Sequence, residues 1–462
     1  MTALEPIFRQ LKTRSQALRS EPVQARVARL TKLGKWLRAN QQALAEAVYR
    51  DLGKPAMEVE TSELFPVYAE INHAIANIEQ WTDPVKIDAP ITFIGTRSEV
   101  RREPKGTCLI ISPWNYPFNL CIGPLVSCLT AGNTALLKPS ELTPNTSAFI
   151  SKLVDEVFEK DVVAVALGDA AVASELLQLP FDHIFFTGSP AVGKIVMRAA
   201  AERLASVTLE LGGKSPAIID ASANLKDTAK RIAFGKFLNN GQTCIAPDYV
   251  LIDKSVKEEF LRLLEENVAT LFTRSEDYGR IVSERHFDRL NALLTGAISQ
   301  GATKVLGGTP DRSTKYFPPT VLDNVAGNML VMEEEIFGPI LPVISMDVRA
   351  EAVDFINSKP RPLALYIFSK DRAFRENVLK NTSAGGVCIN DCLLQFAHPN
   401  LPFGGINNSG LGKAHGHAGF LAFTHEKPVV RQKSGYANAY LFYPPYTSLK
   451  RRILAVILRW FI

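Results

Sequence analysis

Cys244 is the residue whose surroundings most suggest chemistry, because it directly follows the turn-forming sequence NNGQT at 239–243. A thiol is a good nucleophile only as the thiolate, and an electropositive or dipolar setting favours that form. A glycine-containing turn can place the cysteine near a helix N-terminus, where an anion is stabilised. Alone, the position stays ambiguous, since an isolated cysteine is more often a small core residue.

Two further positions could assist a nucleophile. Glu210 ends an apolar strand pattern and precedes Gly212-Gly213, so its carboxylate could act as a general base if the environment raises its pKa. Asn115 follows the apolar run 108–112, and an asparagine at a strand end can donate its side-chain N–H to an oxyanion. The alternatives are a surface glutamate and ordinary turn chemistry.

Other strand-to-helix junctions could hold a phosphate or a sugar. The sequence TGSPAVGK at 187–194 follows an apolar strand, and the N–H groups of a following helix could bind a phosphate there, although the GxGxxG fingerprint is absent. Lys138 and Glu141 follow another strand, where α/β sheets bind ligands. In EEEIFGP at 333–339 an acid lies two residues before an aromatic ring. Each stretch is also compatible with a solvated loop or a helix cap.

Composition and charge limit the function classes. The 462 residues exceed one ordinary core, so two or three domains are expected. A net charge of +5 is small for this length and no basic block is present, which argues against a nucleic-acid partner. The six cysteines form no CxxC pair and the histidines complete no zinc pattern, so no metal site is expected. The N-terminal residues lack an apolar signal segment, which favours free thiols in a reducing, cytoplasmic compartment.

The apolar spacing predicts the elements that position these residues. Residues 5–81 show helical spacing, and residues 91–102 have the composition of an extended ribbon. From residue 108 onward, apolar strands alternate with helical patterns, which predicts mostly parallel sheets covered by helices. The expected strands are 108–112, 134–137, 183–186, 217–220 and 249–252. Residues 409–434 are irregular and are expected to be loop and ribbon.

Taken together and in this order, the motifs resemble the aldehyde dehydrogenase superfamily, and within it class 3, which includes the fatty aldehyde dehydrogenases. The resemblance runs from about residue 5 to residue 446. It rests on long motifs that are rare in combination: WNYPFN at 114–119, LKPSE at 137–141, GQTCIAPDY at 241–249, PFGGINNSGLG at 402–412 and YPPY at 443–446.

The resemblance implies a role for each matching position. Cys244 corresponds to the nucleophile, Glu210 to the general base, and Asn115, with the backbone N–H of Cys244, to the oxyanion hole. The implied cofactor is NAD or NADP and the substrate is an aldehyde, medium- or long-chain aliphatic or aromatic. Glu141 is expected to repel a 2′-phosphate and so to favour NAD. The implied cofactor-binding residues are Trp114, Lys138, Glu141, Gly188, Ser189, Gly193, Glu335 and Phe337.

The fold implied is α/β, with two open-sheet domains and a bridging oligomerisation ribbon. The cofactor domain is expected at 1–84 and 106–210 and the catalytic domain at 211–395. The bridging segments are expected at 85–105 and 396–440, and the C-terminal tail at 441–462. Class 3 members are commonly dimers, so a homodimer is expected.

Two departures and three alternatives accompany the resemblance. Asn407 stands where glycine is more usual, and Phe234 stands where tryptophan is often seen near the aldehyde entrance. A CoA-acylating dehydrogenase would not need Glu210, and a non-enzymatic structural protein on this fold would not need Cys244, Glu210 and Asn115. A cysteine hydrolase would need a histidine partner, for which the sequence offers His398, His415 and His417 without a hydrolase motif.

The tail at 449–462 is expected to be an amphipathic helix too short to span a bilayer. One side is broadly apolar, and Lys450, Arg451, Arg452 and Arg459 supply positive charge. Three uses fit this pattern: a lid over the aldehyde entrance, a peripheral membrane contact with anionic headgroups, or plain packing on the body.

Overall fold

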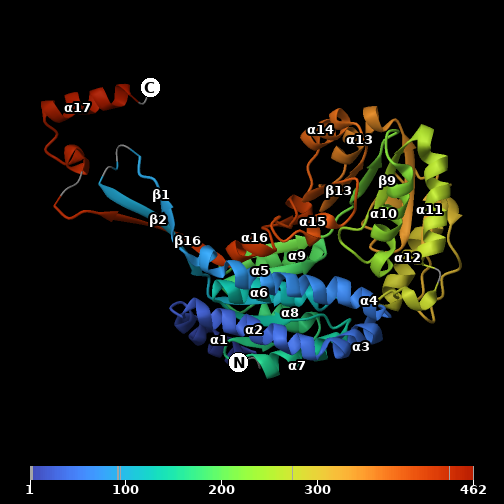
Figure 1. The fold of residues 1–462 in the computed structure, drawn as a ribbon, viewed down its shortest axis with the longest axis horizontal. Helices are drawn as coiled ribbons and strands as arrows, with labels where there is room; N and C mark the ends of the chain where they lie inside the picture. The colour runs from blue at the N-terminus through green and yellow to red at the C-terminus, as the bar shows by residue number, and fades with distance from the viewer. Residues whose placement is uncertain (1–3, 91–92, 94, 273, 436–437, 461–462) are drawn as a thin grey trace.

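The computed structural model describes residues 4–90, 93, 95–272, 274–435 and 438–460. Two α/β bodies, each built around one open sheet, form the main part of the molecule (Figure 1). A thin arm leaves them and ends in a helix that stands apart from both bodies (Figure 1). The two open sheets and the bridging segment agree with the architecture expected from sequence.

The N-terminal residues form helices because their apolar side chains recur at helical spacing and become buried, as Phe8, Leu11 and Leu18 do in the first helix. A π-helical turn at Glu60–Leu64 was not expected, and such turns are frequent at functional sites. The helices are α1 Glu5–Leu18, α2 Val23–Ala39, α3 Gln41–Leu52, α4 Ala56–Val59 and α5 Phe65–Thr82.

The first sheet has six strands in the order β15-β7-β6-β3-β4-β5, of which β15 runs antiparallel to β7. Because β4 and β6 lie on opposite sides of β3, the carboxyl ends of β3 and β6 form a topological switch point, where open α/β sheets bind ligands. The strands are β3 Thr107–Ile111, β4 Thr134–Lys138, β5 Val163–Val165, β6 His183–Gly188, β7 Ser206–Leu211 and β15 Gly410–Leu411. The helices between them are α6 Asn119–Ala131, α7 Pro144–Val157, α8 Ala170–Leu176 and α9 Pro190–Ala201.

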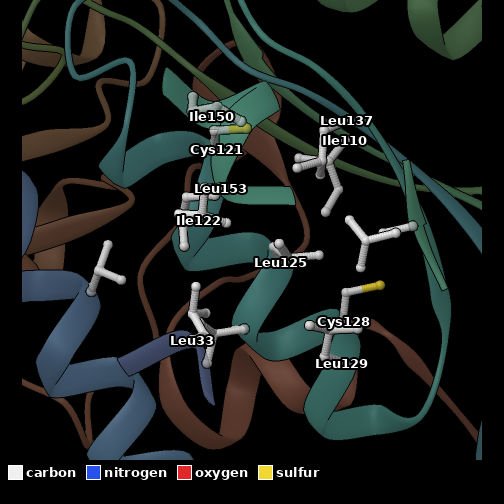
Figure 2. Packing of buried hydrophobic residues seen from close by; sticks show 14 of the residues in the cluster. Leu33, Ile110, Cys121, Ile122, Leu125, Cys128, Leu129, Leu137, Ile150 and Leu153 are labelled. Carbon is white, nitrogen blue, oxygen red and sulfur yellow. The ribbon is translucent and has the colours of Figure 1, made fainter. Parts of the chain in front are cut away.

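Helix α6 carries the central apolar layer of this body. Figure 2 shows Leu125 of α6 between the strand residues Ile110 and Leu137 on one side and Leu33 of α2 on the other. Burial on all sides explains why α6 is apolar around its whole circumference rather than on one face. This rigid layer fixes the start of α6, which lies next to Asn115.

The second sheet has seven strands in the order β10-β11-β12-β9-β8-β13-β14. β10 runs antiparallel to β11, and the pairings from β11 to β14 are parallel. The strands are β8 Pro216–Ile219, β9 Tyr249–Asp253, β10 Thr303–Leu306, β11 Thr320–Asp323, β12 Ile340–Met346, β13 Ala364–Phe368 and β14 Gly386–Ile389. The helices are α10 Leu225–Phe237, α11 Lys257–Leu271, α12 Glu284–Ser299, α13 Val348–Asn357 and α14 Arg372–Asn381.

The arm is a three-stranded antiparallel sheet in which β2 Thr96–Pro104 lies between β1 Val85–Ile87 and β16 Thr424–Gln432 (Figure 1). The ribbon expected at 91–102 is therefore shifted toward the C-terminus, and its positions 91, 92 and 94 lie outside the described residues. The third strand adds hydrogen bonds to a ribbon that would be marginal with two strands.

Residues 409–434 are not only loop and ribbon, so that part of the prediction is wrong. They also contain helix α16 Gly416–Ala422, which contacts α5 and α6 and buries Phe420. Two glycines in seven residues gave no helical signal, yet Gly419 is what permits the packing. A Cβ at Gly419 would lie 2.5 Å from Oγ of Ser127 on α6.

The tail forms the expected helix, α17 Ser448–Arg459, which Thr447 caps by accepting a hydrogen bond from the Lys450 N–H at 3.3 Å. None of its residues is buried. Among the helices in the described part of the chain, none has the length and apolar character needed to cross a bilayer.

Candidate active site

Cys244 lies in a loop whose backbone shape depends on left-handed residues. Asn239 and Asn240 have φ values of 52° and 58°, which asparagine tolerates better than most residues. Gly241 has φ 70°, and a Cβ there would lie 2.3 Å from the carbonyl oxygen of Gly338. Only glycine lets the Cys244 loop approach the 335–339 loop this closely, so the NNGQTC motif is required by its geometry.

One cavity of about 280 Å³ brings Cys244 together with Glu210, although the two residues come from different sheets. Most of its wall is apolar. Phe65 and Phe234 are 65% and 51% exposed, which places them on the solvent side of the cavity. The other large apolar residues of the wall are Leu120, Leu238, Leu393, Phe396 and Phe403.

Asn115 is buried and held by the Cys244 loop, and it is not among the residues that line this cavity. Its Nδ2 donates to the main-chain carbonyl of Gln242 at 2.9 Å. Nδ2 of Asn239 donates to the Asn115 carbonyl at 2.8 Å and to the Gln242 carbonyl at 3.1 Å. The Asn115 amide is therefore bonded to Gln242, which precedes Cys244 by two positions. The amide retains a second N–H that this bond does not use.

A buried ion pair behind Asn115 was missed by the sequence reading. Nζ of Lys54 donates to Glu63 at 3.0 Å and to the Asn115 carbonyl at 3.2 Å, and both side chains are fully buried. Glu63 also accepts from the N–H groups of Phe118 and Asn119 at the start of α6. The pair thus connects the π-helical turn to the backbone of Asn115. The available signal was Glu63, an acid within an otherwise apolar helical pattern.

Glu210 is buried, and neither of its carboxylate oxygens has a hydrogen-bond partner among the described residues. Burial raises the pKa of its carboxyl well above the ordinary value, although the charge of Lys413 opposes the rise. A carboxyl whose ionisation is opposed by burial, and which lines a cavity, can accept a proton from water once it ionises.

Burial also raises the pKa of the Cys244 thiol, and the carboxylates of Glu335 and Glu210 raise it further. The backbone N–H groups of Cys244 and Ile245 act in the opposite direction. The protonated thiol is therefore favoured, chiefly by burial. Burial and nearby Asp248 raise the pKa of Glu335 to about 8, which reduces the negative charge near the thiol at neutral pH.

The carboxyl edge of the first sheet gathers the residues expected to hold a cofactor. Ser189 caps α9 by accepting from the Val192 N–H at 3.4 Å, next to Gly188 at the end of β6. A Cβ at Gly193 would lie 2.7 Å from Leu211, so this glycine sets the close approach of α9 to β7. The N-terminus of α9 therefore lies at the switch point, a position that suits a pyrophosphate without a third fingerprint glycine.

Lys138 and Glu141 follow β4 at the same edge. Nζ of Lys138 donates to Glu141 at 2.7 Å, and the lysine is buried whereas the Glu141 side chain is 43% exposed. A buried cation beside an accessible carboxylate fits a sugar with adjacent hydroxyls.

Glu335 and Phe337 belong to a loop held against the nucleophile. The Glu335 carboxylate accepts from the Gly213 N–H and lies where a Cβ of Gly212 would be, 2.0 Å from Oε2. Phe337 has φ 48°, a strained value for an aromatic residue, and its ring meets Trp114 edge-on at 5.3 Å. Arg289 fixes the loop by donating to the carbonyls of Glu335 and Ile336.

These residues have the chemistry that a dinucleotide needs: a helix N-terminus, a buried cation beside an accessible carboxylate, and paired aromatic rings. A family model for the aldehyde dehydrogenase family matches residues 4–429. The chain belongs to the aldehyde dehydrogenase family. It is an α/β oxidoreductase that oxidises aldehydes with NAD or NADP, and the family, fold class and activity predicted from sequence are confirmed.

Relatives and solved structures agree with this membership. The chain is 42% identical to 4,4′-diaponeurosporen-aldehyde dehydrogenase of Staphylococcus aureus, over 98% of this chain and 99% of that protein. It is 40% identical to human aldehyde dehydrogenase family 3 member B1, over 99% and 97%. A substrate-bound structure of Staphylococcus aureus AldH superposes with a TM-score of 0.95 at 41% identity, covering 99% of this chain and 100% of that chain.

Aldehyde dehydrogenase structures that hold each cofactor are similar as well. A glyceraldehyde-3-phosphate dehydrogenase of Methanocaldococcus jannaschii with NADP has a TM-score of 0.86 at 25% identity, over 93% of this chain and 94% of that chain. An indole-3-acetaldehyde dehydrogenase with NAD⁺ has a TM-score of 0.86 at 26% identity, over 93% and 88%. The expectation of NAD or NADP is thus confirmed, and the reading as a non-enzymatic structural protein is set aside.

The two departures from the family pattern take plain structural positions. Asn407 has φ 55°, a left-handed value that explains why glycine suits this site and why asparagine can replace it. Its side chain accepts a hydrogen bond from Arg361. Phe234 lies on the wall of the cavity that holds Cys244, so its identity affects the aldehyde entrance.

Proposed function

We propose that Cys244 is the nucleophile, Glu210 the general base, and Asn115 with the Cys244 N–H the oxyanion hole of this aldehyde dehydrogenase. The observation that carries the proposal is the shared cavity in which a thiol and an unpartnered buried carboxyl meet. Matching motif positions in the family support the same roles.

In this proposal the thiolate of Cys244 attacks the aldehyde carbon, and Asn115 and the backbone N–H stabilise the oxyanion that forms. The adduct on Cys244 loses a hydride and becomes an acyl thioester; an oxidised nicotinamide cofactor held at this site would supply the hydride acceptor. Glu210 then takes a proton from water, and the hydroxide cleaves the thioester to give the acid and the free thiol. Overall, aldehyde, oxidised cofactor and water yield the carboxylate, the reduced cofactor and two protons.

The cofactor contacts belong to the same proposal. Gly188, Ser189 and Gly193 would hold the pyrophosphate at the start of α9, and Lys138 and Glu141 the adenosine ribose. Glu335 would contact the nicotinamide ribose, with Phe337 and Trp114 packed near the ring. The edge-on contact between the rings of Trp114 and Phe337 supports the proposal that they form one wall of the nicotinamide site.

The substrate class follows from the cavity wall. Phenylalanine and leucine side chains dominate it, so a medium- or long-chain aliphatic or an aromatic aldehyde gains the most from burial there.

The assembly is proposed to be a homodimer formed through the arm, with domain limits 1–84 and 106–210, 211–395, and 85–105 with 396–440. The apolar side chains Val85, Ile87 and Val430 are exposed on the arm and need a cover. Free cysteines favour a reducing, cytoplasmic location.

Helix α17 is proposed to touch a membrane surface or to act as a lid. The exposed fractions of Leu449, Val456 and Trp460 are 66%, 57% and 86%, so the subunit's own body does not cover this apolar face. Basic side chains and an interfacial tryptophan on one helix are typical of contact with anionic headgroups.

The test compares Cys244→Ala with Cys388→Ala, a matched change at a second half-buried cysteine outside the cavity lining. Initial rates with a chain-length series of aldehydes, NAD and NADP should vanish only in the first variant, while its cofactor binding persists. Assays with and without CoA distinguish hydrolysis of the thioester from transfer to CoA. Turnover in Cys244→Ala would contradict the nucleophile assignment, and a strict need for CoA would favour the acylating alternative.

A further inference from the structure

A buried histidine and glutamate meet on the wall of the cavity that holds Glu210. His415 and Glu70 both line this cavity. The distance between Nδ1 of His415 and Oε1 of Glu70 is 2.8 Å, and their side chains are 13% and 10% exposed. Their positions are 345 residues apart in sequence, and no motif points to the pair.

The imidazole is held in place at a cost in backbone strain. His415 has φ 68°, which is unfavourable for a residue with a side chain. Glu70 secures this conformation, since it also accepts from the Gly416 N–H at 3.1 Å. The rings of Phe396 and Phe403 meet the imidazole edge-on at 4.7 and 5.4 Å and fix its plane. Strain retained by several contacts at a cavity indicates a function for the residue.

A second histidine, His73, extends this series of titratable groups away from the cavity. His73 lies one helical turn after Glu70 on α5, so both side chains share one face. A Cβ at Gly416, whose N–H binds Glu70, would lie 3.3 Å from Nε2 of His73. Burial would raise the pKa of the Glu70 carboxyl, but the hydrogen bond from His415 and the charges of both histidines outweigh it and lower that pKa.

His73 opens to a different space. It lines a surface groove of about 420 Å³, together with Trp81, Arg102 and His417. Glu70 is therefore flanked by one histidine on the active-site cavity and by another on an outer groove. Alternating imidazole and carboxylate groups are suited to passing protons, because each can accept on one side and donate on the other.

Polar groups around Glu210 lie at the end of this series that faces the active-site cavity. Thr187 lies directly opposite Glu210 in the pairing of β6 and β7. Oγ1 of Thr187 and both Glu210 oxygens are buried without a hydrogen-bond partner among the described residues, and both side chains, with that of Ser127, line the cavity. Buried polar groups of this kind usually bind water, and the cavity that they line is the one that His415 also lines.

The chemistry requires such an exit. Each turnover releases two protons, one from the thiol and one from the water that Glu210 activates, and the phenylalanine and leucine side chains that dominate the cavity wall cannot accept them. We propose that His415, Glu70 and His73 form a relay that carries protons from the chamber of Glu210 to the outer groove. The proposal rests on the proposed function, and it adds a proton route that uses none of the residues assigned to catalysis or cofactor binding.

Other titratable and charged groups border the relay and could alter its pH response. Lys413 and Glu210 face the inner end from the 404–413 loop and β7. Arg102 of β2 and Glu426 of β16 act on His417 at the outer end, where His73 also lies. Cys244 and Glu335 lie beyond Glu210.

The experiment uses the full-length enzyme with NAD and an aldehyde, followed by stopped flow for NADH formation and for proton release with an indicator dye. His415→Gln and His73→Gln should leave the first-turnover NADH burst unchanged, because the thiol and cofactor site are intact. Proton release and the steady-state kcat should slow about 10-fold, a modest part of what proton-transfer groups usually contribute. Added imidazole should restore kcat in both variants in a concentration-dependent way, which a purely structural defect would not do.

His417→Gln is the matched control, since His417 lines the same outer groove and contacts Trp81 but belongs to α16 and not to the face of α5 that carries Glu70 and His73. It should behave as wild type. His73→Gln leaves the buried His415–Glu70 pair intact, so it tests the relay even if His415→Gln fails to fold. Proton release that keeps pace with NADH in His73→Gln, with no effect of imidazole, would overturn the relay. Absence of NADH formation in the wild type would instead contradict the proposed function.

Discussion

The side-chain amide of Asn115 donates to the main-chain carbonyl of Gln242 at 2.9 Å, so the predicted oxyanion donor and the nucleophile loop are held by a direct hydrogen bond. A second hydrogen bond runs in the opposite direction, because Asn239 of the loop donates to the Asn115 carbonyl. One N–H of the Asn115 amide orients the group, and in the proposed oxyanion hole the other would donate to a substrate oxygen.

Asn115→Ala should lower kcat by about 10²- to 10³-fold, the usual effect of losing one oxyanion donor. Asn239→Ala is the comparison, since it removes a bond to the same Gln242 carbonyl without removing the donor, and its loss of kcat should be smaller. Steady-state kinetics and thermal melting of both variants check this. Equal losses of kcat would show that Asn115 acts only by shaping the loop.

Glu210→Gln should stop the reaction at the thioester. The amide cannot take a proton from water, so mass spectrometry of enzyme with aldehyde and NAD should show an acyl adduct on Cys244. In the wild type, deacylation requires the ionised carboxylate, whose pKa burial has raised. Its rate should therefore rise with pH above the ordinary range of a carboxyl, and this rise should be absent in the variant. Deacylation at the wild-type rate in Glu210→Gln would exclude the residue as the base.

Glu335→Gln should make the Cys244 thiol more reactive in the free enzyme. The pKa of Glu335 is about 8, and its ionised form raises the pKa of the thiol. As pH rises through 8 a negative charge thus appears beside Cys244 in the wild type and not in the variant. Alkylation by iodoacetamide across pH should separate the two curves above that value. Glu333→Gln, at an exposed position of the same loop, is the control.

The chemical core of the site was predictable because it lies in contiguous motifs whose shape is set locally. The left-handed Asn239, Asn240 and Gly241 show why NNGQTC cannot vary freely. The strands were predictable for a similar reason. A fully buried parallel strand such as β4 has a continuous apolar run, which is here Ala135, Leu136 and Leu137.

The remainder depends on contacts between distant segments. Lys54 reaches Asn115 across 61 positions, and Glu70 reaches His415 across 345. Helix α16 forms because Gly419 fits against Ser127, which no local pattern reveals. One signal was available: Glu63 and Glu70 are acids seven residues apart, two helical turns, in an otherwise apolar buried stripe. A charged residue on such a stripe requires a buried partner.

Glu141→Gln should narrow any preference for NAD over NADP. The Glu141 carboxylate is accessible and paired with Lys138 at 2.7 Å, so in the proposed ribose site it would repel a 2′-phosphate while Lys138 would attract it. The ratio of kcat/KM for the two cofactors is the measurement, with Glu156→Gln on the exposed side of α7 as control. An unchanged ratio would place the discrimination elsewhere.

Deleting residues 449–462 should change long-chain aldehyde kinetics more than short-chain kinetics and should lower binding to anionic liposomes. Helix α17 carries Lys450, Arg451, Arg452 and Arg459 and exposes its apolar face, whereas the catalytic residues are untouched by the deletion. Short aldehydes should therefore still react at the wild-type rate. Liposome flotation with anionic and neutral lipids separates the two functional uses, since a lid needs no lipid and a membrane contact should require negative charge. Reversing the charge at Arg452 and Arg459 to glutamate keeps the helix but should abolish the liposome contact alone. If all chain lengths respond equally and no liposome binding occurs before truncation, the helix serves only packing between subunits.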